Sequence, residues 1–174
     1  YLEIYDALNI EKKEKEYNFS FDDEGTTLRL SDCNNACYSV DDNTILLTYS
    51  KNADGVYVIS YDLDTGKINK YLEFAGISSN VQVGFYDDEL FYVADLRSSQ
   101  SVSLTLYQLG NEEAIWTNNL KGKTDIFKTA GCELENGAEF IVCTVGSNLY
   151  TLNVDSGDIT NEFIMNDSIV KILK

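Results

Sequence analysis

The chain contains no histidine and no proline, and only one Met and one Trp, among its 174 residues. Without histidine, the Ser–His and Cys–His pairs that activate nucleophiles cannot form, and a zinc site would lack its usual nitrogen ligand. Without proline, the turns must come from Gly, Asn, Asp and Ser, which adopt positive φ or hydrogen-bond to nearby backbone. These absences disfavour the common nucleophilic enzymes and predict turns built on short polar side chains.

Basic residues are also scarce, with 13 Lys and Arg against 29 Asp and Glu, which gives a formal charge of −16. The only lysine cluster, Lys12-Lys13-Glu14-Lys15, is short and diluted by acid. Since nucleic acid needs a basic stripe to neutralise its phosphates, we predict no nucleic-acid partner. No run reaches the about 18–20 apolar residues of a membrane span, so we predict no membrane partner either. A basic partner or a divalent cation, in contrast, would be drawn toward the acidic chain, but solubility is the favoured explanation of its charge.

The cysteines are too few for a disulfide framework in a chain of this length. They are Cys33, Cys37, Cys132 and Cys143. We interpret them as buried free thiols, because cysteine behaves as a small hydrophobe; the alternative is a Cys33–Cys37 or Cys132–Cys143 disulfide in an extracellular domain. The first 20 residues lack a signal-peptide pattern and the chain begins at Tyr1, as expected for a processed protein or an excised segment. The compartment stays open, with a cytoplasmic location favoured over an extracellular one.

What the chain does contain is a hairpin signature that occurs three times. It reads Tyr61-Asp62-Leu63-Asp64-Thr65-Gly66, then Tyr107-Gln108-Leu109-Gly110-Asn111, then Leu152-Asn153-Val154-Asp155-Ser156-Gly157. The steps are 46 residues (107 − 61) and 45 residues (152 − 107), about the length of one four-stranded propeller blade. Tyr, Phe and β-branched residues, which favour pleated surfaces, are abundant. The sequence therefore predicts an all-β fold of four-stranded antiparallel blades.

Each complete unit resolves into four short apolar or alternating runs separated by turn residues. The expected strands are Ala36–Val40, Thr44–Ser50, Gly55–Asp62 and Ile68–Phe74; Val81–Tyr86, Glu89–Asp95, Ser101–Leu109 and Ala114–Asn119; and Ile126–Leu134, Ala138–Val145, Asn148–Asn153 and Ile159–Met165. No helix is expected, and the charged stretch Glu11–Glu16 is expected to be a solvated turn.

The two ends of the chain read as partial blades. Tyr1–Asp6 and Lys13–Phe19 resemble the last two strands of a blade, Thr26–Leu30 an additional strand, and Ser168–Leu173 the first strand of another blade. We therefore expect about three full blades plus partial blades at both ends. Residues 1–174 would form a single β-propeller-like repeat domain that is a segment of a larger propeller.

The segment Ile59–Ile68 resembles the end of a blade in WD40-like and quinoprotein-like (PQQ-like) propellers. In these families a strand runs into an Asp, a Thr-Gly-Lys turn follows, and the outer strand of the blade begins after it. Trp116 lies where the quinoprotein-like repeat often carries tryptophan. The chain has no Gly-His and no Trp-Asp pair, so the WD40 hydrogen-bonded tetrad has no counterpart here. The resemblance implies a propeller-like repeat protein. Because the sequence shows no pocket signature for a quinone, we expect no cofactor.

Two turns look superficially like calcium loops, namely Asp62-x-Asp64-x-Gly66 and Asn153-x-Asp155-x-Gly157. Both lack the third acid and the final bidentate Glu of such a loop, and hairpin turns closed by an Asx side chain explain them fully. The acidic pairs Asp41-Asp42 and Asp87-Asp88 also fall between strands, where solvated carboxylates would not acquire catalytic pKa values.

Tyrosines are the remaining recognition candidates, because their rings combine apolar area with a polar tip. They are Tyr49, Tyr57, Tyr86, Tyr92 and Tyr107. The alternative interpretation is that they pack between neighbouring sheets.

We therefore expect a noncatalytic propeller module for protein interaction or ligand sensing within a larger protein, with no catalytic, cofactor-binding or metal-binding residues. A protein partner is expected, and open sheet edges predict self-association. Two alternatives stay open: a hydrolase or lyase that uses carboxylates in a propeller channel, and an extracellular binding domain with disulfides.

Overall fold

The computed structural model of the chain is an all-β protein built from antiparallel strands, β1 to β16. It describes residues 2–6, 9–17, 20–23, 26–29, 33–39, 43–51, 55–74, 81–96, 98–123, 127–133 and 139–165. Within this part of the chain, no helix has the length and hydropathy needed to cross a membrane.

Two hairpins precede the repeats. They comprise β1 (Leu2–Asp6) with β2 (Asn9–Tyr17), and β3 (Ser20–Asp23) with β4 (Thr26–Arg29). The expectation that Glu11–Glu16 is a solvated turn is wrong, because these residues belong to β2, where Glu16 lies opposite Glu3 and Lys15 opposite Ile4. Backbone pairing with β1 outweighs the poor strand propensity of Glu and Lys. The additional strand expected near Thr26 is present as β4.

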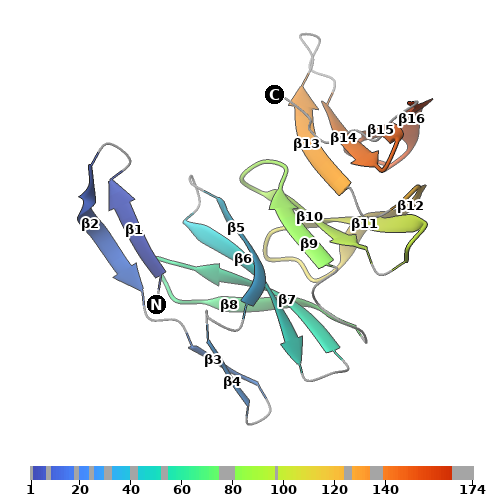
Figure 1. The fold of residues 1–174 in the computed structure, drawn as a ribbon. Helices are drawn as coiled ribbons and strands as arrows, with labels where there is room; N and C mark the ends of the chain where they lie inside the picture. Colours follow the sequence, from blue (N-terminus) through green and yellow to red (C-terminus); the bar gives the residue numbers. More distant parts are fainter. Residues whose placement is uncertain are drawn as a thin grey trace.

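The three expected repeats are three four-stranded sheets, each a simple meander in which successive strands are neighbours. They are β5 (Cys33–Ser39), β6 (Thr44–Lys51), β7 (Gly55–Asp62) and β8 (Ile68–Phe74); β9 (Val81–Phe85), β10 (Leu90–Asp95), β11 (Ser101–Gln108) and β12 (Ala114–Lys121); and β13 (Phe127–Glu133), β14 (Glu139–Val145), β15 (Asn148–Asn153) and β16 (Ile159–Ile164). Figure 1 shows these sheets side by side in chain order. This propeller-like arrangement confirms the predicted fold class; the strand expected at Ser168–Leu173 lies outside the described residues.

Each sheet has two distinct ends, because a meander places its first and third turns together. At one end Leu63 N donates to Asn43 O (2.9 Å), and Leu109 N donates to Glu89 O (2.7 Å). At the opposite end Gly122 N donates to Gln100 O over 2.9 Å. The first end therefore carries the β7–β8, β9–β10, β11–β12 and β15–β16 turns.

The core consists of side chains between sheets. The junction between β5–β8 and β9–β12, here called the first junction, contains Leu46, Val56, Val58, Tyr71, Val81, Val83, Phe91, Val93 and Tyr107. The second junction, between β9–β12 and β13–β16, contains Ala94, Val102, Leu104, Leu106, Trp116, Leu120, Phe127, Ile141, Cys143, Val145, Tyr150, Leu152 and Val154. Both faces of the middle sheet are thus buried, since alternate residues along each strand lie on opposite faces.

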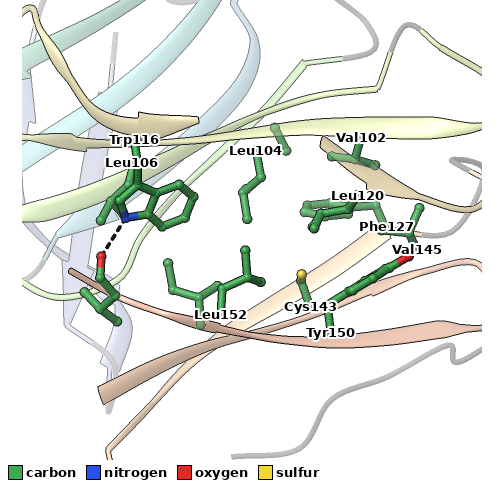
Figure 2. Packing of buried hydrophobic residues seen from close by; sticks show 13 residues of the cluster. Val102, Leu104, Leu106, Trp116, Leu120, Phe127, Cys143, Val145, Tyr150 and Leu152 are labelled. Carbon is green, nitrogen blue, oxygen red and sulfur yellow. Dashed lines mark hydrogen bonds between the residues drawn. The ribbon is translucent and has the colours of Figure 1, made fainter. Parts of the chain in front are cut away.

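Each junction also contains a polar link from the fourth strand of a sheet to the last turn of the next sheet. In the first junction the hydroxyl of Tyr71 accepts a hydrogen bond from Gly110 N over 2.8 Å. In the second junction Trp116 Nε1 donates to Val154 O over 2.6 Å, as the dashed line in Figure 2 shows. Figure 2 also shows Trp116 and Leu106 on the same side of the cluster as this bond, with Cys143 and Tyr150 across from Leu120.

Candidate interaction surface

The turns at the first end of the sheets are closed by Asx side chains. Asp62 Oδ1 accepts hydrogen bonds from Asp64 N (3.0 Å) and Thr65 N (2.7 Å). These bonds to the Thr65 backbone and side chain are the main reason that the pKa of Asp62 lies below its usual value. The left-handed φ of +70° at Gly66 completes the turn. The first of the two loops that resemble calcium sites is therefore a hairpin turn, as predicted.

The other turns use the same chemistry. Asn153 Oδ1 accepts from Ser156 N over 3.0 Å, which explains the second calcium-like loop in the same way. Asp87 Oδ1 accepts from Glu89 N and Leu90 N, over 2.8 and 2.6 Å. Within the described residues, no group of three potential ligands has the geometry to hold a metal ion.

Several carboxylates in and beside these turns are also exposed to solvent. The exposed ones at this end, here called the acidic end, are Asp64, Asp87, Asp88, Glu89, Glu112, Glu113, Glu139, Asp155 and Asp158. Among the described residues of these turns, the basic side chain is that of Lys67. The exposed Lys121 and Lys123 lie at the opposite end of the sheets. The acidic end is therefore a rim of negative charge on a backbone fixed by hydrogen bonds.

Some of these carboxylates also connect one turn to another. Asn43 Nδ2 donates to Asp64 Oδ2 over 3.0 Å, and the Tyr86 hydroxyl lies 3.4 Å from Glu139 Oε2, across from the β9–β10 turn to β14. The first contact thus joins two turns of the first sheet, and the second joins the second sheet to the third at the acidic end.

The acidic pairs singled out in the sequence do not converge in a buried site. Asp87 and Asp88 are exposed, and Ser39 Oγ lies 3.5 Å from Asp88 Oδ1. Asp41 and Asp42 lie outside the described residues. Asp87 and Asp88 have the environment of turn residues, so they give no support to a carboxylate-dependent hydrolase or lyase.

The described cysteines, Cys33, Cys37 and Cys143, are free thiols. Cys143 is fully buried in the second junction, and burial raises its pKa to about 12. Cys132 is opposite Phe140 in the β13–β14 ladder and Cys143 is opposite Thr129, so the two cysteines are not cross-strand partners. This register argues against the alternative of a Cys132–Cys143 disulfide.

Most of the tyrosines proposed for recognition pack in the interior. Tyr49, Tyr57 and Tyr107 are buried, and Tyr107 stacks on Phe91 with ring centroids 5.4 Å apart. Tyr86 and Tyr92 are half-buried, and desolvation raises the pKa of Tyr92 above its ordinary value. The ring of Tyr92 lies over Gly84, where an added Cβ would be 2.1 Å from the hydroxyl oxygen. Packing between sheets is thus the main role of this set.

The sequence reasoning missed a second exposed feature, at the end of the last sheet. Phe163, Ile164 and Met165 are exposed although they are large and apolar. The sequence does contain a sign of this apolar surface. Phe163 and Met165 are two positions apart in a predicted strand, so their side chains share one face.

Comparison with known proteins bears on the fold alone. No protein-family pattern matches the chain, and no curated protein matches its sequence. Among solved structures, the chain is similar to acylaminoacyl peptidase in complex with Z-Gly-Gly-Phe-chloromethyl ketone, a protein that has a β-propeller domain. The TM-score is 0.52 at 13% sequence identity, and the match covers 84% of this chain and 27% of the peptidase chain. The chain thus spans about a quarter of the protein that it resembles.

Proposed function

We propose that the chain is a noncatalytic part of a propeller-like domain and that it binds a basic protein surface through the acidic end. The observation that carries the proposal is the one-sided distribution of charge among the described residues. Carboxylates from four turns gather at one end, whereas Lys121 and Lys123 lie at the other. Charge of one sign on a rigid rim accelerates encounter with an oppositely charged partner and fixes its orientation.

The local structure of the turns supports this role. In the β7–β8 turn, Asp62 fixes the backbone by hydrogen bonds to two successive amides, while Asp64 stays exposed. The exposed carboxylate is therefore presented from a fixed position, which lowers the entropy lost on binding. The narrower assignment to a WD40-like or quinoprotein-like repeat, and the use of the module for ligand sensing, remain predictions from the sequence.

A noncatalytic role fits the environment of the ionisable groups. General acids and bases acquire perturbed pKa values by burial beside other charges, but the shift at Asp62 arises from hydrogen bonds that close a turn. The pKa values of the buried Tyr92 and Cys143 are strongly raised, and desolvation is the main cause in both. We therefore expect no chemical turnover by the described residues.

Quantitative cross-linking in cell extract tests the proposal. The wild-type chain is compared with a neutralised variant that carries Asp64→Asn, Glu112→Gln, Glu113→Gln and Asp155→Asn, all at exposed positions. The matched control carries Lys121→Gln and Lys123→Gln at the opposite end. We expect cross-links to basic proteins to fall roughly tenfold in the neutralised variant and with rising salt, and to persist in the control. Equal cross-linking by all three chains contradicts the proposal.

A further inference from the structure

The exposed apolar residues at the end of β16 can be understood by comparing the last sheet with the two sheets before it. In each sheet we call the face toward the preceding sheet upstream and the face toward the following sheet downstream. The ladders align the sheets residue by residue, because Ile45 is opposite Tyr61, Phe91 opposite Tyr107, and Ile141 opposite Leu152. Positions related by this alignment can be compared directly across the three sheets.

The downstream faces of the first two sheets are covered by the next sheet. Val58 in β7 and Leu104 in β11 occupy equivalent positions, and both are fully buried in a junction. In the last sheet the equivalent residue is Leu149, which is only half-buried. Likewise Leu46 is buried in the first junction, whereas its equivalent in β14, Val142, is half-buried.

The fourth strand shows the largest contrast. Leu120 pairs with Val102 and is 0% exposed, whereas its equivalent Met165, whose N donates to Ser147 O, is 49% exposed. The position of Asn118 in β12 is taken by Phe163 in β16, which is 52% exposed. Val142, Leu149 and Met165 are therefore apolar residues at positions that an earlier sheet buries, and Phe163 adds a large apolar side chain where the middle sheet has the half-buried Asn118.

We infer that the downstream face of β13–β16, formed by Phe140, Val142, Leu149, Phe163 and Met165, is the docking surface for a further four-stranded sheet of the same repeat. The incoming sheet presents an upstream face, of the kind that Val81, Val83, Phe91 and Val93 present in the first junction. Removing Phe163 and Met165 from water supplies the driving force, in proportion to the apolar area covered. The inference rests on the proposed function in one respect only, which is that the chain is part of a longer propeller-like domain.

A second copy of the chain does not fit this surface as well. Docking of the repeat kind requires a free upstream face, and the upstream faces of the second and third sheets are already used in the two junctions. That of the first sheet is buried too, with Tyr49, Tyr57 and Ile59 all 0% exposed. A second copy therefore has no free upstream face to offer on any of the three four-stranded sheets.

Site-specific labelling tests the inference. Phe163→Cys is made in the 174-residue chain and in an extended chain, in which a second copy of residues 81–121 follows Lys174 through a flexible linker. This segment forms the sheet β9–β12 and contains no cysteine. Alkylation of each cysteine is followed by peptide mass spectrometry, which separates residue 163 from the native thiols. The control is Ile115→Cys on β12, where the natural side chain is 43% exposed.

We expect alkylation at residue 163 to be roughly tenfold slower in the extended chain and alkylation at residue 115 to be unchanged. The substitution Val93→Asp, made only in the added copy, should restore fast alkylation, because it places a charge on the upstream face. Equal rates at residue 163 in the two chains overturn the inference. Protection that increases with concentration of the 174-residue chain also overturns it, in favour of a second copy.

Folding of the extended chain is checked separately by hydrogen exchange in β14 and β15, which should be as slow as in the shorter chain. A further measurement does not require the label: Phe163→Ser should lower the melting temperature of the extended chain but not that of the 174-residue chain. These measurements report sheet packing and not partner binding. A negative result here leaves the role of the acidic end unaffected, and the reverse also holds.

Discussion

The two junctions perform the same task with different side chains. The first junction is aromatic: Tyr71 meets Phe91 edge-on with centroids 4.8 Å apart, and Phe91 stacks on Tyr107. The second junction surrounds the separate rings of Trp116, Phe127 and Tyr150 with mostly aliphatic side chains. In both, the fourth strand of one sheet forms a hydrogen bond with the last turn of the next sheet. A repeat can therefore conserve the site of a contact without conserving its residue type.

The polar links also differ in direction. The turn of the next sheet is the donor in the first junction, where Gly110 N–H binds the Tyr71 hydroxyl, and the acceptor in the second, where Val154 O receives Trp116 Nε1–H. The Trp116 link is buried and the Tyr71 link is part-buried. Because a buried polar group that loses its partner costs more free energy than one that water can reach, the second junction should be the more sensitive to substitution.

The largest effect is expected from Trp116→Ala. The substitution removes a buried ring and leaves Val154 O without its partner, so we expect a loss of about 4 kcal/mol in the free energy of unfolding. Urea denaturation followed by circular dichroism measures it, with the exposed neighbour Ile115→Ala as control. A loss no greater than that of the control would show that the ring does not hold the second junction together.

Gly157→Ala should be the next most damaging change. Gly157 has a φ of +72°, and an added Cβ would lie 2.5 Å from Trp116 Cδ2, so the new methyl group must displace the ring. We expect a loss of about 3 kcal/mol. The matched control is Gly110→Ala in the first junction, where φ is +83° but nothing lies within 4 Å of the added Cβ; backbone strain alone should cost about 1 kcal/mol. Equal losses would contradict a special contact at Gly157.

Alkaline pH should weaken the second junction through Cys143. Its folded-state pKa of about 12 exceeds the ordinary thiol value of 9.0, so the thiol ionises first in the unfolded chain. The stabilising effect of keeping the thiol neutral is complete below pH 9 and is lost as the pH rises toward 12. We expect Cys143→Val to remove about 1–2 kcal/mol of the pH dependence between neutral pH and pH 10. Unfolding curves of both proteins across that range test this, and parallel curves would contradict it.

The smallest effect is expected from Tyr71→Phe. The ring and its contacts remain, but Gly110 N and Ser60 Oγ, which lies 3.1 Å from the hydroxyl, lose a hydrogen-bond partner. We expect a loss of about 1 kcal/mol, because solvent can reach Gly110. A double-mutant cycle with Ser60→Ala measures the coupling; a coupling of zero would mean that the hydroxyl serves Gly110 alone.

Much of the fold was predictable because strand alternation and turn chemistry are local. The strands Gly55–Asp62, Ile68–Phe74 and Asn148–Asn153 have the predicted bounds. The hairpin turns at Asp62 and Asn153 form by the predicted Asx mechanism. In both cases the deciding interactions join residues within a few positions of one another, so the sequence contains the information.

The contacts between sheets were not predictable in the same way. Trp116 and Val154 are 38 residues apart, and their pairing depends on how two sheets pack. Strand irregularities add to the difficulty: register shifts occur between Val58 and Ile59 and between Leu106 and Tyr107, at different places in the repeat. A one-residue shift moves every later side chain to the other face, so the spacing of residues alone does not place Tyr71 or Trp116. The acidic end was missed for the same reason, since its turns are remote in sequence.

Within the described part of the chain, every strand ladder stays inside one sheet, and side-chain packing with a few polar links joins each sheet to the next. Deformation within a sheet breaks backbone hydrogen bonds, whereas a small tilt between sheets only rearranges side-chain contacts. Each sheet should therefore resist deformation more strongly than the junction between two sheets does. We therefore expect substitutions at junction residues to change the angle between neighbouring sheets more than the geometry within a sheet.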